Sequence, residues 1–151
     1  MQIAEILLIE KGKRPDPSQY LSQDYINNHL AQFDNGAIRF ASLEAVKKYG
    51  TVGPQGRFVL PKKDFDRIIH DFKGNFNDIE NHLGLDKGTL SNSDTGIFYI
   101  PKEQLNNLRI PSGNEGGANS QWIPGGKTSG GINETVVDFN KDTKVQLLEV
   151  K

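Results

Sequence analysis

The sequence predicts a small α+β domain in which N-terminal helices precede a mainly antiparallel sheet, and strands near the C-terminus complete that sheet. Three observations support this fold class. The chain has 151 residues, which suits one hydrophobic core. Its 35% hydrophobic and 25% charged residues are typical of globular proteins. Helical periodicity fills much of the first half, and short strand-like runs recur from residue 37 to the end.

The first residues differ from the rest in their pattern. The run IAEILLIE is compatible with a strand or a short helix, and Pro15 and Pro17 interrupt the chain after it. We therefore expect residues 1–19 to be a linker or N-terminal extension. Residues 20–151 are then expected to form the functional domain.

Helices are expected wherever apolar residues recur at helical spacing between capping residues. Ser22 is a predicted N-cap of the first long helix, and Gly50 ends a later one as a C-terminal cap. The predicted helices span residues 23–33, 42–49, 62–72 and 77–83.

Strands are expected where β-branched and aromatic residues are bounded by turn residues. Pro61 and Pro101 stop two such runs, because proline cannot donate to a sheet ladder. NLRIP is a weaker candidate than the others. The predicted strands are AIRFAS (37–42), GRFVLP (56–61), GIFYIP (96–101), ETVVDF (134–139) and KVQLLEVK (144–151), the last two joined by 140–142.

Composition excludes several classes of function. No apolar run approaches the roughly 20 residues that span a bilayer, so we expect no membrane association. The absence of cysteine excludes disulfides, thiolate metal sites and cysteine nucleophiles. The net charge of −1 argues against a duplex-DNA binder. Residues 39–73 nevertheless carry eight basic and four acidic residues, which fits either a phosphate-binding face or a solvated helix surface.

Arg39 and Glu134 form the first candidate catalytic pair. An arginine on a strand is suited to hold a dinucleotide pyrophosphate, because its guanidinium makes bidentate hydrogen bonds. A carboxylate at the end of a loop is suited to stabilise an oxocarbenium-like ribose. Together they fit cleavage of a nicotinamide–ribose bond. The alternative is that Arg39 is a structural ion-pair partner and Glu134 an ordinary loop carboxylate.

The segment from Ile110 to Glu134, here called the glycine-rich segment, is the second candidate. Residues 111–131 hold seven Gly, two Pro and the single Trp. A structureless loop of this length usually has a function, and glycine lets backbone approach a ligand closely. It contains neither a Rossmann fingerprint nor a Walker loop. A loop that only wraps the core, with the Trp as a plug, is the alternative. The candidate substrate-binding residues are Arg109, Asn119, Trp122, Thr128 and Ser129.

His70 is the candidate general acid or base of a second function. A metal-independent ribonuclease needs a group that titrates near neutrality and cations for the phosphate, and Arg67 and Lys73 lie near His70 in sequence. A surface histidine on an amphipathic helix is the alternative.

The chain from about Tyr20 onward resembles the C-terminal toxin domains of bacterial polymorphic toxins of the Rhs and contact-dependent-inhibition type. The resemblance rests on YINNHLAQF with GAIRF, on KYGTVGPQGRFVLP, on LGLDKGTL and on NLRIPSGNEGGANSQWIPGGKTSGGINETVVDF. It implies a domain delivered by a larger secreted scaffold into the cytoplasm of a target cell. It also implies a protein or RNA target and a cognate immunity protein.

Two subfamilies of these toxins are similar in part. In ADP-ribosyltransferase-like toxins an early strand arginine binds NAD and a late glutamate opens a strand, which Arg39 and Glu134 resemble. The NAD glycohydrolases have patterns that KYG, GRFVLP and WIPGG resemble. The resemblance therefore implies NAD as substrate, with no metal. A toxin ribonuclease and a non-enzymatic binding module remain the alternatives.

Overall fold

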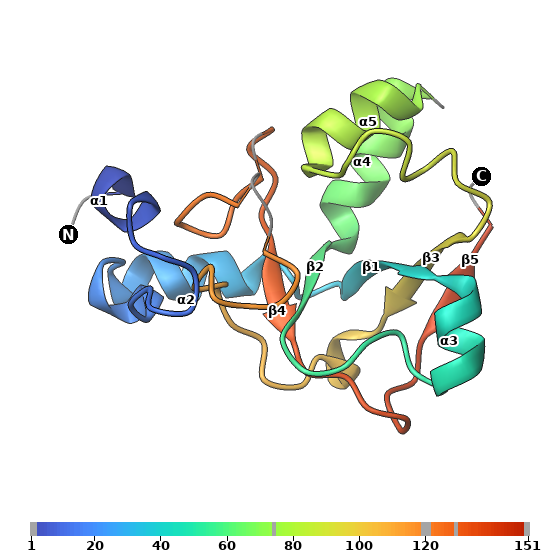
Figure 1. Cartoon of the computed structure of the whole chain (residues 1–151). Coiled ribbons are helices and arrows are strands. Elements are labelled where there is room, and N and C mark those ends of the chain that lie inside the picture. The colour runs from blue at the N-terminus through green and yellow to red at the C-terminus, as the bar shows by residue number, and fades with distance from the viewer. Residues whose placement is uncertain (1–2, 74, 119–121, 129, 150–151) are drawn as a thin grey trace.

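The computed structural model describes residues 3–73, 75–118, 122–128 and 130–149, and it confirms the predicted α+β class (Figure 1). Within these residues, no helix combines the length and the apolar character needed to cross a membrane. The elements are α1 (Ile3–Leu7), η1 (Pro17–Gln19), α2 (Gln23–Ala31), β1 (Ala37–Ser42), α3 (Leu43–Tyr49), β2 (Arg57–Pro61), α4 (Lys62–Phe72), α5 (Phe76–Leu83), β3 (Thr95–Ile100), η2 (Lys102–Gln104), β4 (Thr135–Val137) and β5 (Gln146–Leu148).

The five strands form one antiparallel sheet in the order β4-β2-β1-β3-β5. β1 pairs with β3 along its full length, from Ala37 opposite Ile100 to Ser42 opposite Thr95. Its ladder with β2, by contrast, ends after two pairs, the second of which joins Ile38 to Leu60. The central strand therefore leaves β2 just before Arg39.

The core lies on both faces of the sheet, because successive side chains of a strand point to opposite faces. On one face Ile38 packs with residues of α4 and α5, including Phe65 and Ile79. On the other face Ala37 packs with Phe33 and with residues from β2, β3 and β4. In Figure 1 helices α4 and α5 lie above the sheet and α3 lies below it.

Local capping explains where the helices begin and end. The Ser22 hydroxyl accepts a hydrogen bond from the backbone N of Tyr25, 3.1 Å away, as predicted for an N-cap. The chain leaves α3 through Gly50, whose φ of 72° is in the left-handed region that glycine adopts without strain. The helices predicted from sequence are all present, and IAEILLIE contains the short helix α1.

One strand prediction differs from the structure. NLRIP contributes only an isolated bridge between Arg109 and Val136, because the chain turns away after one pair. The last two strands do form, but β4 pairs with β2 and β5 with β3, so they lie at opposite edges of the sheet.

The N-terminal extension is attached to the glycine-rich segment. The Asn114 side-chain oxygen accepts hydrogen bonds from the backbone N of Gly12 (2.8 Å) and of Arg14 (3.1 Å). The Arg14 guanidinium donates to the Gly113 carbonyl at 2.7 Å. Ile6 of α1 is fully buried. The two segments, 100 residues apart in sequence, therefore hold each other in place.

Candidate functional site

A cavity of about 240 Å³ lies between β1, β2, the end of α5 and the glycine-rich segment. It brings together four residues that the sequence singled out, Arg39, Trp122, Thr128 and Glu134. Arg57 and Phe58 of β2 also line it. We refer to this space as the first cavity.

Arg39 lies at the point where β1 leaves β2. Its Nε donates to the Val52 carbonyl at 3.1 Å and its Nη1 to the Phe58 carbonyl at 3.2 Å. The guanidinium thus takes the place of strand-to-strand hydrogen bonds. No carboxylate pairs with it within the described ranges, so it is not the ion-pair partner of the alternative interpretation. Burial, and secondly the charge of Arg57, lower the pKa of Arg39 to about 10, which leaves it cationic at neutral pH.

Arg57 is a functional candidate that the sequence did not single out. A Cβ on Gly116 would lie 2.9 Å from its Nη1, so the guanidinium lies against the glycine-rich segment. In the part of the chain that the structure describes, Arg57 forms no ion pair. Two adjacent cations without a counterion are costly to hold near a low-dielectric interior. An anion bound between the two guanidinium groups would offset this cost.

Glu134 precedes β4 and is fixed through its backbone. Its N donates to the Gly126 carbonyl at 2.7 Å, and its own carbonyl is 2.7 Å from Nε2 of His29. Burial of the side chain, and secondly the charge of Glu115, raise the pKa of Glu134 to about 7. A carboxyl that gains and loses a proton near neutrality is a candidate acid or base.

His29 positions the chain at Glu134. This α2 side chain is only 4% exposed, and because a carbonyl accepts only, the Nε2 facing Glu134 must carry a proton. Burial is the main cause of a lowered His29 pKa, which favours the neutral ring. One turn earlier on α2, the Tyr25 hydroxyl donates to the Gly125 carbonyl at 2.5 Å. No sequence pattern links α2 to this turn, so sequence reasoning missed His29.

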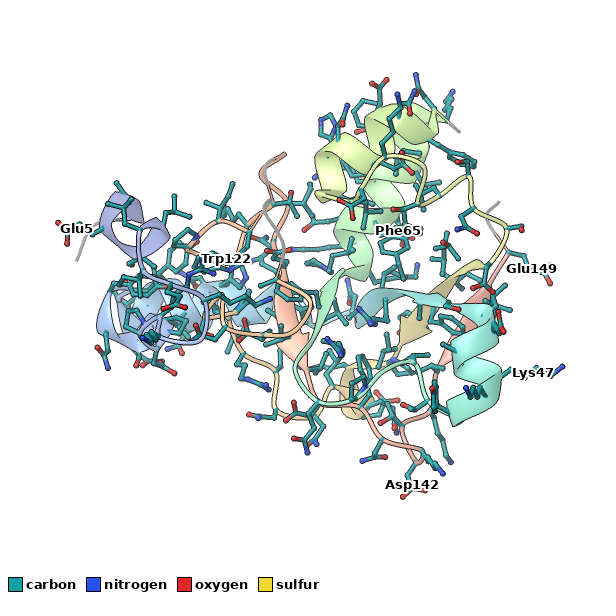
Figure 2. The ribbon with its side chains drawn as sticks, viewed as in Figure 1. Glu5, Lys47, Phe65, Trp122, Asp142 and Glu149 are labelled. Atoms are coloured by element: carbon teal, nitrogen blue, oxygen red, sulfur yellow. The ribbon has the colours of Figure 1, made fainter. Side chains whose placement is uncertain are left out.

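Trp122 forms part of the cavity wall and is only 5% exposed. Its ring lies against Gly113, where a Cβ would be 2.6 Å from the ring. The Arg14 guanidinium lies 4.5 Å from the ring centroid on the N-terminal side. Figure 2 shows Trp122 where the N-terminal region meets the glycine-rich segment. Its buried Nε1 has no hydrogen-bond partner among the residues described.

The other predicted substrate-binding residues have different positions. The Thr128 hydroxyl donates to the His82 carbonyl at 2.6 Å, so it fastens the glycine-rich segment to α5 while its side chain lines the cavity. Arg109 lies outside the first cavity and forms an ion pair of 3.1 Å with Asp138. Asn119 and Ser129 lie outside the described residues.

His70 does not reach the first cavity. It is on α4 with 81% of its side chain exposed, and its nearest charged partner is Asp71 at 3.3 Å. His70 therefore lies apart from the arginine pair, and the ribonuclease hypothesis based on His70 with Arg67 and Lys73 stays a prediction. Comparisons of the chain with protein-family models, with curated proteins and with solved structures found no match.

Proposed function

We propose that this chain is the effector domain of a bacterial polymorphic toxin and that it consumes NAD, transferring ADP-ribose to a macromolecule or to water. One observation carries the proposal. A partly buried carboxyl with a raised pKa, Glu134, lines the same cavity as two arginines that have no acidic partner among the described residues. Anion-binding and proton-transfer groups are thus present in one small space.

The arginines provide the binding energy for the pyrophosphate of NAD. Arg39 uses Nε and Nη1 on backbone carbonyls, and no hydrogen bond from its Nη2 is found in the described part of the chain. In that part of the chain the Arg57 guanidinium also makes no hydrogen bond, so its N–H groups remain available to a ligand. Charge-assisted hydrogen bonds to phosphate are about twice as strong as neutral ones. Binding of the negatively charged pyrophosphate also offsets the repulsion between the two arginines.

Glu134 then acts on the nicotinamide–ribose bond. The C1′–N bond breaks with both electrons passing to the ring nitrogen, which leaves neutral nicotinamide and an oxocarbenium-like ribose. The Glu134 carboxylate stabilises that positive charge. Water, or a nucleophile of the target, attacks C1′, and its proton passes to the carboxylate and on to solvent. The active form of Glu134 is therefore the ionised form.

The toxin context rests on the resemblance, and the position of the matching residues supports it. The string from Asn107 to Phe139 supplies Trp122, Thr128 and Glu134 of the cavity wall. We accordingly propose delivery by a larger scaffold into the target-cell cytoplasm, with a cognate immunity protein as partner.

The test is release of nicotinamide from NAD by the purified protein, followed by chromatography, with and without a bacterial extract that contains acceptors. We expect release, and its loss in Glu134→Gln. Labelled NAD distinguishes transfer to a macromolecule from hydrolysis. No release under either condition would refute the proposal.

A ribonuclease remains the second candidate, because a carboxyl that titrates near neutrality beside two arginines also fits metal-independent cleavage of RNA. In this version Glu134 replaces His70 as the base for the 2′-hydroxyl. Incubation with total RNA tests it. Cleavage that survives His70→Ala but not Glu134→Gln, without nicotinamide release, would favour it over NAD consumption.

A further inference from the structure

A second cavity, of about 720 Å³, lies beside α3 and meets the first at the arginine pair. The two cavities share Arg39, Phe40 and Arg57 as lining residues. They adjoin where β1 separates from β2, since the ladder between these strands ends at Ile38. Arg39 and Arg57 therefore lie between two compartments, with the first cavity on one side and the second cavity on the other.

We propose that the second cavity binds a purine nucleoside whose diphosphate lies on Arg39 and Arg57. The assignment of this ligand to NAD rests on the function proposed above. Under that function the second cavity holds the adenosine half of NAD and the first cavity holds the nicotinamide riboside half. The binding chemistry itself, a purine joined to a diphosphate, requires no reaction.

The sizes of the cavities favour a divided ligand. Sites for small molecules and cofactors usually measure roughly 300–1,000 Å³. At about 240 Å³ the first cavity is too small for a whole dinucleotide, whereas the second, at about 720 Å³, has room for a nucleoside. A diphosphate bridging the two compartments would place one ring system in each.

The walls of the second cavity suit a purine. Ala45 and Tyr49 are four residues apart on α3, so they lie on one face of that helix, and both line the cavity. Tyr49 is 59% exposed, with the Lys48 ammonium 5.3 Å from its ring centroid, so much of the ring is accessible for stacking on a base. Val52 adds apolar surface, and Lys141 adds a third cation.

The charges decide which half belongs in which cavity. The described lining of the second cavity includes no acidic residue, so it attracts a phosphorylated ligand and contains no group to act on a glycosidic bond. Glu134 lines only the first cavity. The bond that breaks must therefore lie in the first cavity. The second cavity is left for the unreactive adenosine half.

The test is the binding of ADP, measured by isothermal titration calorimetry, with inorganic pyrophosphate as the comparison ligand. Ala45→Leu places a larger side chain in the second cavity and Tyr49→Ala removes the stacking ring. We expect each to weaken ADP binding on the order of 10-fold, because base stacking on an aromatic side chain contributes about that much or more. Pyrophosphate binding should not change, since the arginines remain.

Ala31→Leu is the matched control, because it makes the same substitution at an exposed position of α2. Thermal melting confirms that each variant is folded. Glu134→Gln should bind ADP at least as well as wild type. Absence of ADP binding in wild type, or equal ADP affinity in wild type, Ala45→Leu and Tyr49→Ala, would overturn the inference. ADP binding of the expected kind without nicotinamide release would instead reject NAD consumption while supporting the purine site.

Discussion

Replacing Glu134 by glutamine should stabilise the protein above neutral pH. Burial raises the pKa of this carboxyl to about 7 from an ordinary value of 4.5, so the folded state disfavours its ionised form. The sign follows from proton linkage: as pH rises from 4.5 to 7 the unfolded chain ionises first, and the wild type loses stability. The loss is complete above pH 7 and amounts to about 3 kcal/mol at most.

Glutamine has nearly the same shape and no charge, so the Glu134→Gln variant should escape this loss. We expect equal urea midpoints for wild type and variant at pH 4, and a more stable variant at pH 8, measured by circular dichroism. Glu103→Gln is the control, because the same substitution at an exposed position should show no such dependence on pH. A difference between Glu134→Gln and wild type that stays constant from pH 4 to pH 8 would refute the view that the fold raises the pKa of Glu134.

Three further predictions concern residues around the first cavity. Arg57→Gln should weaken pyrophosphate binding at least about 10-fold without lowering the melting temperature. The reason is that Arg57 makes no described ion pair and repels Arg39. Calorimetry measures the binding and thermal melting the stability, and unchanged binding would contradict the prediction. His29→Phe should cost about 1–3 kcal/mol in urea unfolding, because it leaves a buried carbonyl without a donor; a neutral effect would show that this hydrogen bond does not hold the site. Arg14→Ala should shift Trp122 emission, since the guanidinium covers that ring; an unchanged spectrum would show that the extension leaves the cavity wall unaffected.

Local signals in the sequence predicted most of the secondary structure. Ser22 and Gly50 mark helix ends through backbone geometry that depends on a few neighbouring residues, and both act as expected. Pairing between strands depends on distant residues instead. The sequence therefore predicted the last two strands but not that they occupy opposite edges of the sheet, and it did not predict that Arg109 contributes only one bridge.

The same distinction between local signals and contacts with distant residues applies to the candidate site. Arg39 and Glu134 were chosen for their chemistry, and the structure shows both lining one cavity. Arg57 and His29 were missed, because one depends on the short ladder between β1 and β2 and the other on a contact that crosses 105 residues of sequence. His70 had suitable chemistry and neighbours in sequence, but α4 carries it to the solvent. The chemical type of a residue predicts its role in a site only when the fold brings the required partner residues close to it.

The pH dependence of nicotinamide release from NAD tests the proposed role of Glu134 most directly. Since the ionised carboxylate is the active form, kcat/KM of the wild type should rise about tenfold per pH unit below about 7 and then level off, because kcat/KM reports the free enzyme. Glu134→Gln should lose on the order of 100-fold or more at pH 8. No release at any pH, or a Glu134→Gln variant that matches the wild type throughout, would contradict the proposed mechanism.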